Sequence, residues 1–142
     1  MRAFDKRLFL VVIVITMSLI FSSCATKEKF LNSTVVPAAE GRVIIKKDKN
    51  NNYHVNVSVN NLADPGKLQP PKEVYIIWME TEMQATKNLG RIKTSKGMLS
   101  SGLKASFETV STLRPKKIFI SAEASAEVPE PSLIVLTTGD FY

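Results

Sequence analysis

The sequence predicts an all-β domain, an immunoglobulin-like antiparallel β-sandwich of about seven strands that spans residues 41–142. Short segments rich in β-branched and aromatic residues follow one another, and Gly, Pro and Asn mark the turns between them. No segment beyond residue 41 has the 3.6-residue period of an amphipathic helix. Two packed antiparallel sheets are the natural way to bury such strands, and a small closed barrel is the alternative.

Residues 1–23 have the layout of a secretory signal peptide. Basic side chains precede an apolar run at 8–21, and two small residues, Ser22 and Ser23, follow it. A membrane-spanning helix needs about 20 apolar residues, which is more than this run supplies. The run is also apolar on every face, whereas a core helix has one apolar stripe. The segment therefore predicts export.

The motif Ile20-Phe21-Ser22-Ser23-Cys24 resembles the lipobox of bacterial lipoproteins, although Phe21 stands where that family usually has an aliphatic residue. The resemblance implies a diacylglycerol on the Cys24 sulfur, cleavage before Cys24 and acylation of the new amino terminus. Cys24 is the only cysteine, so it cannot form an internal disulfide, and lipidation gives it a role. Two or more acyl chains anchor a protein stably, at ~0.8 kcal/mol per buried methylene.

Ala25 follows the cysteine at the position that sorts lipoproteins of gram-negative bacteria. An Asp there tends to retain the protein at the inner membrane, so the resemblance implies the outer membrane. The membrane leaflet and the bacterial group stay open.

Removal of the signal leaves 119 residues with a formal charge of +4, enough for one domain. The basic residues are spread along the chain, with short groups at 46–49 and 114–117, and no aromatic residues alternate with them as in single-strand binders. We therefore expect a solvated basic surface near anionic envelope material and no nucleic-acid partner.

Residues 24–40 comprise the lipidated cysteine and a predicted tether. The segment has no sustained periodicity and contains Pro37. Such a tether could hold the domain at most ~50 Å from the bilayer. A short piece such as Phe30-Leu31 can dock onto the domain.

The clearest strand signal is the alternation at 53–60, which places Tyr53 and three valines on a core face and His54, Asn56, Ser58 and Asn60 toward water. A shorter strand at 42–46 precedes it. The Asn-rich segment 48–52 predicts the turn that joins the two strands into a hairpin.

Further strands follow a loop marked by Asp64-Pro65-Gly66 and Pro70-Pro71. The segment 73–79 is apolar on both faces, as expected for a central strand covered on each side. The remaining predicted strands are 88–93, 103–110, 116–123 and 132–137.

The hydrophobic pattern of 75–80, 88–92, 118–123 and 129–132 is similar to the extracytoplasmic β-sandwich of anti-sigma-K-type factors and of small lipoproteins that share this domain. The resemblance covers most of residues 41–138. It implies the fold and an exported location. It does not imply anti-sigma activity, because we find no cytoplasmic sigma-binding segment and no spanning helix in the sequence.

Three aromatic residues are candidates for ligand or partner contact: Trp78, Tyr75 and Tyr53. A large aromatic side chain beside Ile76 and Ile77 usually packs in a core, so we expect Trp78 to be a core anchor. The alternative for Trp78 is a platform on which a ligand stacks.

Reactive groups are few. Ser101 and Lys104 have a Ser-x-x-Lys spacing, but that chemistry needs a helix and further motifs. His54 is the only histidine, so no zinc site and no convincing triad is predicted. The segment 48–52 opens like a calcium loop, yet Tyr53 and Val59 occupy the glycine and glutamate positions, which indicates a turn.

The carboxylates are interpreted as surface charge: Glu80, Glu82, Glu123, Glu127 and Glu130. No catalytic residue, metal or cofactor is predicted. The sequence favours a non-catalytic, lipid-anchored cell-envelope module that binds another envelope protein or supports an envelope complex. A small-ligand or glycan-binding lipoprotein is the alternative, and an enzyme ranks third.

Overall fold

The computed structural model describes residues 25–97 and 101–141. Over these residues it contains nine strands and one short 3₁₀ helix at Pro65–Lys67. The strands are β1 (Ala25–Lys29), β2 (Glu40–Lys47), β3 (Tyr53–Leu62), β4 (Val74–Thr81), β5 (Thr86–Arg91), β6 (Lys93–Lys96), β7 (Leu103–Ser111), β8 (Pro115–Glu123) and β9 (Leu133–Thr137).

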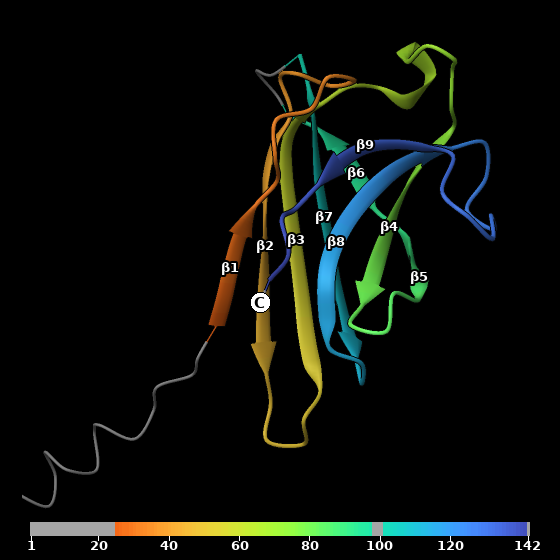
Figure 1. Cartoon of the computed structure of the whole chain (residues 1–142). Coiled ribbons are helices and arrows are strands. Elements are labelled where there is room, and N and C mark those ends of the chain that lie inside the picture. The colour runs from red at the N-terminus through yellow and green to blue at the C-terminus, as the bar shows by residue number, and fades with distance from the viewer. Residues whose placement is uncertain (1–24, 98–100, 142) are drawn as a thin grey trace, which may run out of the picture.

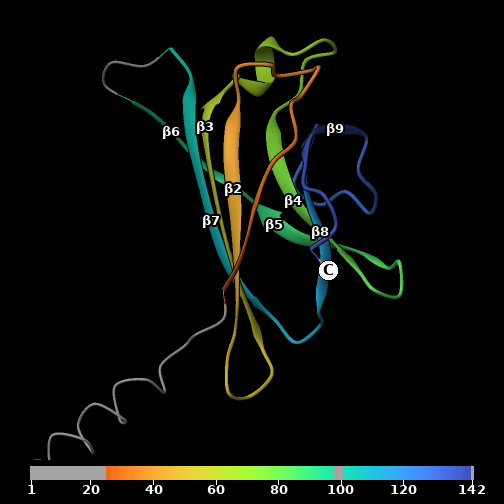
Figure 2. The ribbon, with the colours of Figure 1, turned by 60° about the vertical axis from the view of Figure 1, so that its left-hand side comes forward.

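The strands form two antiparallel sheets packed as a sandwich (Figure 1). One sheet has the order β1-β2-β3-β7-β6 and the other has the order β5-β4-β8-β9. Figure 2 shows the two layers, with β2, β3, β6 and β7 in one and β4, β5, β8 and β9 in the other. The pairing of β2-β3-β7-β6 against β5-β4-β8-β9 is the immunoglobulin-like order, so the predicted fold class is confirmed.

The predicted hairpin is present as β2 and β3, which pair from Glu40–Asn60 to Lys47–Tyr53. Asp48 organises its turn, since one carboxylate oxygen accepts hydrogen bonds from the backbone N–H of Asn50 at 2.8 Å and of Asn52 at 2.9 Å. The backbone N–H of Asn52 is the main reason that the pKa of Asp48 is lowered to about 2. The segment 48–52 is therefore a turn, as predicted.

The main core lies between the sheets. The five-stranded sheet contributes inward valines and isoleucines of β2 and β3, and the four-stranded sheet contributes inward residues of β4 and β8. Each fully buried aliphatic side chain contributes about 1.5–3 kcal/mol relative to exposure. Members of this core include Val43, Ile45, Val55, Val57, Val59, Tyr75, Ile77, Met79, Ile118, Ile120 and Leu136.

A second, smaller core covers the outer face of the four-stranded sheet. Val74, Ile76, Trp78 and Phe119 form it, and the β8–β9 connection packs onto it through Ala126 and Val128. β4 is thus buried on both faces between β5 and β8, as the apolar run at 73–79 predicts.

The segment predicted as a tether differs from the structure, because most of it is folded onto the sandwich. Ala25–Lys29 form β1, which pairs with β2 along its whole length. Phe30 is buried, and the next backbone N–H, of Leu31, donates to Thr137 O at 2.8 Å. The chain therefore crosses from one sheet to the other here. An edge strand such as β1 can be held by backbone hydrogen bonds without alternating apolar residues, so the sequence pattern does not reveal β1.

The predicted strand at 88–93 is also divided between the sheets. Thr86–Arg91 pair with β4, and Lys93–Lys96 pair with β7 in the opposite layer. Ile92 lies between them, is buried in the main core, and donates its backbone N–H to Tyr75 O at 3.0 Å. The chain therefore crosses between the two sheets here as well, at the edge of the sandwich opposite β1 and β9.

Candidate functional site

The outer face of the five-stranded sheet carries the most distinctive surface of the described residues, and we refer to it as the basic sheet face. Strand alternation turns the core residues of β2 and β3 inward, so every second residue points outward. The cross-strand rows of this face are Ala25–Lys46–His54–Val110, Lys27–Ile44–Asn56–Glu108 and Lys29–Arg42–Ser58–Ser106–Lys93.

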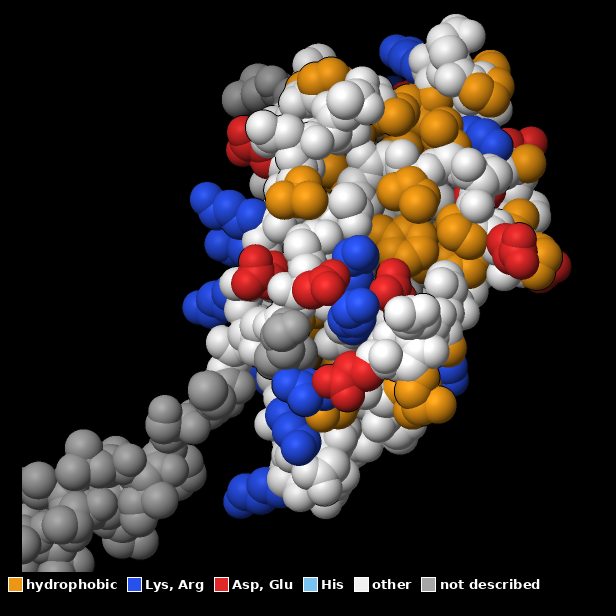
Figure 3. All heavy atoms as spheres, viewed as in Figure 1, with side chains coloured by type: hydrophobic (Ala, Val, Ile, Leu, Met, Phe, Trp, Pro, Cys, Tyr) orange, Lys and Arg blue, Asp and Glu red, His pale blue; other side chains and the backbone are white. Residues whose placement is uncertain are grey.

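Positive charge dominates these rows. Lys27, Lys29, Arg42, Lys46 and Lys93 are exposed on this face, and its acidic residues are Glu108 and, in the adjoining row, Glu40, which pairs with Asn60 and lines a hollow beside Arg42. Figure 3 shows blue Lys and Arg side chains along the side of the molecule where β1 lies and at its lower end. Such a concentration of one charge attracts anionic or acidic partners and speeds their association.

Three shallow hollows lie over this face. The first, of about 440 Å³, is lined by Ile44, Lys46, His54, Asn56 and Glu108, among others. A second of about 440 Å³ lies around Arg42 and Ser58, and a third of about 360 Å³ lies around Lys93 and Ser106. The face can therefore receive protruding side chains of a partner.

Polar contacts fix parts of the first hollow. Asn56 Nδ2 donates to Glu108 Oε1 across β3 and β7. His54 Nε2 lies 3.2 Å from Asp48 Oδ2, which orients the imidazole toward the hairpin turn. The exposed Val110 and the half-buried Ile44 supply apolar surface beside these groups. A mixture of apolar and charged groups is typical of a protein-binding surface.

The three aromatic candidates lie in different places. Trp78 is 0% exposed, stacks on Phe119 with ring centroids 6.2 Å apart, and donates from Nε1 to Ser121 Oγ at 2.7 Å. Tyr75 is 2% exposed, and its hydroxyl donates to Ala63 O at 3.0 Å. Burial raises the pKa of Tyr75 to about 12, with a further contribution from the charge of Asp64.

Tyr53 is only half-buried, and Lys47 Nζ lies 5.8 Å from its ring centroid. Of the three aromatic candidates, Tyr53 alone therefore has a ring that a partner can reach. Trp78 anchors a core, as expected, although this core lies outside the inter-sheet layer.

Glu123 corrects the interpretation of the carboxylates as surface charge, because it is 2% exposed. Its carboxylate accepts from the backbone N–H of Ser132 at 2.7 Å and from Ser132 Oγ at 2.5 Å. Burial acts to raise the pKa of Glu123, but hydrogen bonds from Ser121 and Ser132, with the charge of Lys72, outweigh it and hold the pKa below its usual value.

Trp78, Ser121, Glu123 and Ser132 thus form a connected polar chain under the β8–β9 connection. The acceptors are all occupied by neighbouring donors, so the chain fixes the connection rather than presenting a reactive group. Glu127 and Glu130 are exposed, as predicted.

The Ser-x-x-Lys pair does not adopt the geometry of a catalytic pair. Ser101 lies in a bend and Lys104 lies in β7, so no helical turn brings the two side chains together. Among the described residues, no group of three or more His, Cys, Asp or Glu side chains is arranged to hold a metal ion. Within the same residues, no helix is long and apolar enough to cross a membrane.

Cys24, the predicted lipid attachment site, lies outside the described residues. Comparisons of the chain with protein-family models, with curated proteins and with solved structures gave no match. The resemblances to lipoproteins and to anti-sigma-K-type domains therefore stay predictions from the sequence.

Sequence reasoning missed the basic sheet face as a unit. The outward alternation of Arg42, Ile44 and Lys46 was a usable signal, but the neighbours of that strand were not predictable from local pattern. The strand that adds Glu108 and Val110, β7, lies about 50 positions further along the chain.

Proposed function

We propose that the chain is a non-catalytic, lipid-anchored module of the bacterial cell envelope that binds another envelope protein through the basic sheet face. The lipobox-like motif ending at Cys24 supports the anchor, and Ala25 favours the outer membrane. The grouping of three hollows with five exposed cations on one sheet face supports the binding role, and it is the observation that carries the proposal.

The partner expected for this face is a protein with an acidic surface. Arg42 and Lys46 lie beside hollows and are exposed, so they can pair with carboxylates at the rim of an interface. Ile44 and Val110 supply the apolar contact that such an interface needs near its centre.

The anchor is tested by labelling cells with a radioactive fatty acid. Wild-type protein should incorporate the label, and Cys24→Ala should abolish it because the only cysteine is lost. Undiminished labelling of Cys24→Ala would reject lipidation at this position.

The binding role is tested by crosslinking in the native envelope. A photoreactive amino acid at position 56 lies in the first hollow, whereas one at position 127 lies on the β8–β9 connection. Position 56 should capture one stoichiometric protein, and position 127 should not.

A charge-matched pair of variants identifies the role of the cations. Arg42→Glu/Lys46→Glu should lose the captured protein, while Lys67→Glu/Lys87→Glu should retain it, because these exposed residues lie away from the face. Recovery of the module alone from every sample would reject the protein-binding role. The search would then move to glycans and small ligands, for which Tyr53 is the accessible aromatic residue.

A further inference from the structure

Three connections lie at the end of the sandwich where the described chain begins, with the β7–β8 connection between the other two. They are the β2–β3 turn at 48–52, the β4–β5 turn at 82–85 and the β7–β8 connection at 112–114. The register places them together, since Tyr53 pairs with Ser111 and Thr81 pairs with Pro115. This end, which we call the hairpin end, lies at the bottom of Figure 1.

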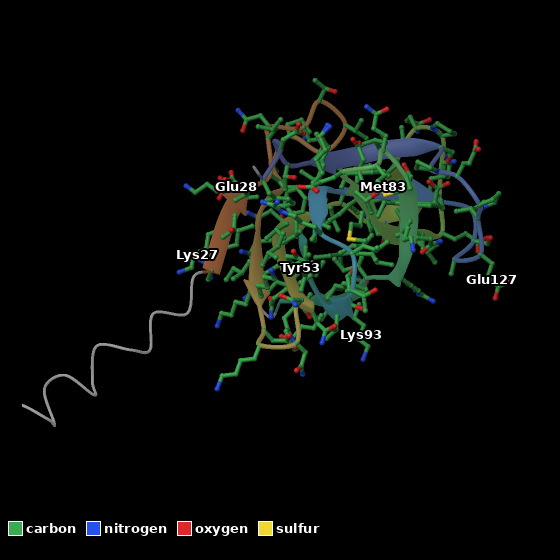
Figure 4. The ribbon with its side chains drawn as sticks, turned by 60° about the horizontal axis from the view of Figure 1, so that its bottom comes forward. Lys27, Glu28, Tyr53, Met83, Lys93 and Glu127 are labelled. Atoms are coloured by element: carbon green, nitrogen blue, oxygen red, sulfur yellow. The ribbon has the colours of Figure 1, made fainter. Side chains whose placement is uncertain are left out.

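Apolar side chains project from two of these connections. Met83 is 88% exposed and Leu113 is 39% exposed. Figure 4 turns the hairpin end forward and labels Met83 on the β4–β5 side and Tyr53 on the β2–β3 side. The flexible, apolar Met83 side chain and the Leu113 side chain can both enter the headgroup–acyl boundary of a bilayer.

Cations accompany the apolar tips. Lys47 and Lys49 are exposed on the hairpin, and the aliphatic stems of such lysines can lie along an apolar boundary while their ammonium groups reach phosphate. Apolar and basic side chains together are the composition of protein surfaces that lie in the headgroup region of a bilayer.

The carboxylates at this end are largely engaged by neighbours. Glu82 pairs with Arg114 at 3.0 Å, and Asp48 accepts the turn hydrogen bonds. Other ion pairs among the described residues join Lys116 to Glu80 at 3.6 Å, Lys116 to Asp140 at 3.7 Å and Lys117 to Asp140 at 3.4 Å. These pairs reduce the repulsion that the carboxylates would exert on an anionic surface.

The path of the chain leads to the same end. Ala25 is the first residue of β1 and pairs with Lys46, directly before the hairpin turn. One peptide bond joins Ala25 to Cys24, so at most about 4 Å of chain separates the predicted lipid attachment point from the sheet. A lipid on Cys24 would leave the domain no free tether.

We propose that the hairpin end docks on a bilayer containing anionic lipids, with Lys47 and Lys49 at the phosphates and Met83 and Leu113 in the headgroup–acyl boundary. This inference rests on the proposed lipid anchor. The strands then run away from the membrane, and the basic sheet face stands beside the bilayer, open to a partner protein.

The test uses the lipidated protein purified from membranes and reconstituted into vesicles of phosphatidylcholine, with or without 30% phosphatidylglycerol. Single cysteines replace Asn50 or Met83 at the hairpin end and Gln69 in the β3–β4 loop at the opposite end. Each is labelled with a fluorophore, since lipidation would block the Cys24 sulfur. Iodide quenching reports exposure to water, and brominated acyl chains report contact with lipid.

In anionic vesicles, labels at positions 50 and 83 should be shielded from iodide, and the label at 83 should be quenched by brominated lipid. The label at 69 should stay open to iodide. A lysine near an anionic surface changes membrane partitioning about fivefold, so Lys47→Gln/Lys49→Gln should weaken docking roughly 25-fold. High salt should also weaken the docking of the wild-type protein, because it screens these charges. Lys67→Gln/Lys104→Gln, two exposed lysines at the opposite end of the sandwich, is the charge-matched control and should leave docking unchanged.

Equal iodide access at positions 50, 83 and 69 in anionic vesicles would overturn docking while leaving the anchor intact. Failure of the anchor is separate: Cys24 would then carry no acyl chain by mass spectrometry. In that case the unlipidated chain should still co-sediment with anionic vesicles in a salt-dependent manner, and its absence from the pellet would reject docking as well.

Discussion

Trp78 donates its indole N–H to the hydroxyl of Ser121 at 2.7 Å, inside the small core on the outer face of the four-stranded sheet. Both side chains are 0% exposed. The hydrogen bond allows a polar indole nitrogen to be buried without an unsatisfied donor, and the stacked ring of Phe119 fills the space beside it.

The Ser121→Ala variant tests this contact. It removes the acceptor and leaves the indole N–H buried, which should lower the free energy of unfolding by about 1–3 kcal/mol. Urea unfolding followed by the fluorescence of Trp78 gives the value. Ser106→Ala, at an exposed position of β7, should stay within about 0.5 kcal/mol of wild type. Equal stability of both variants would contradict the buried hydrogen bond.

The same burial predicts the response of Trp78 to quenchers. Trp78 is the only tryptophan, so the fluorescence reports one site. Iodide should quench the native protein far less than the urea-unfolded chain, because the ring is 0% exposed. Equal quenching in both states would mean that the indole is open to water and available for ligand stacking.

The buried carboxylate of Glu123 predicts a specific loss of stability in acid. Its pKa is lower in the folded protein than the usual value of 4.5, so its contribution to stability is present above about pH 4.5 and is lost as the pH falls through the folded pKa. Glu123→Gln should lower the free energy of unfolding by about 2 kcal/mol at pH 7, because charge-assisted hydrogen bonds from Ser132 are lost.

Urea unfolding at pH 7 and pH 3 measures this difference, which should shrink at the lower pH. Glu127→Gln, at an exposed position, is the control and should follow wild type at both values. A constant difference between Glu123→Gln and wild type would show that ionisation of Glu123 does not stabilise the fold.

Ionisation of Tyr75 should lower the stability of the fold at alkaline pH, the opposite direction to the acid dependence of Glu123. Its pKa is raised to about 12, so the contribution of the neutral phenol is complete below pH 10 and is lost as the pH rises through 12. Tyr75→Phe removes the hydrogen bond to Ala63 O and should cost about 1 kcal/mol at pH 7. Ultraviolet titration should show one tyrosine fewer ionising near pH 12 in this variant; an unchanged titration would contradict the assignment.

The sandwich was predictable where local pattern and burial agree. The alternation of β3 follows from its position between β2 and β7, with one face on the core and the other in water. The continuous apolar run of β4 follows from its burial on both faces. The two-residue period of β3 and the apolar run of β4 identify extended strands with one and with two buried faces, and this pattern predicts a layered all-β fold.

The edge strands β1 and β6 were not predictable in this way. Lys93–Lys96 are exposed throughout, and Ala25–Lys29 are exposed or half-buried, so backbone pairing holds them rather than apolar contact. The burial of Glu123 was not predictable for a different reason. It arises because the β8–β9 connection folds back over the sheet, where the backbone N–H of Ser132 donates to the Glu123 carboxylate. The basic sheet face likewise depends on the non-local pairing of β3 with β7.

The close approach of Gly41 to Phe30 predicts how firmly β1 and the crossing are held. A Cβ on Gly41 would lie 2.6 Å from Ser58 O and 2.9 Å from Phe30 Cδ2, both closer than packing allows. Gly41→Ala should therefore push against Ser58 and Val59 of β3 as well as Phe30, and should lower the free energy of unfolding by about 1–3 kcal/mol, the usual range for overpacking.

Thermal unfolding and limited trypsin digestion measure the two consequences. Trypsin should cut after Lys27 and Lys29 faster in Gly41→Ala, because loss of the Phe30 contact frees β1 from the sheet edge. Gly139→Ala is the matched control, since nothing lies within 4 Å of the added Cβ, and it should resemble wild type in both assays. If Gly41→Ala behaves like Gly139→Ala in both assays, Gly41 does not pack closely against Ser58, Val59 and Phe30.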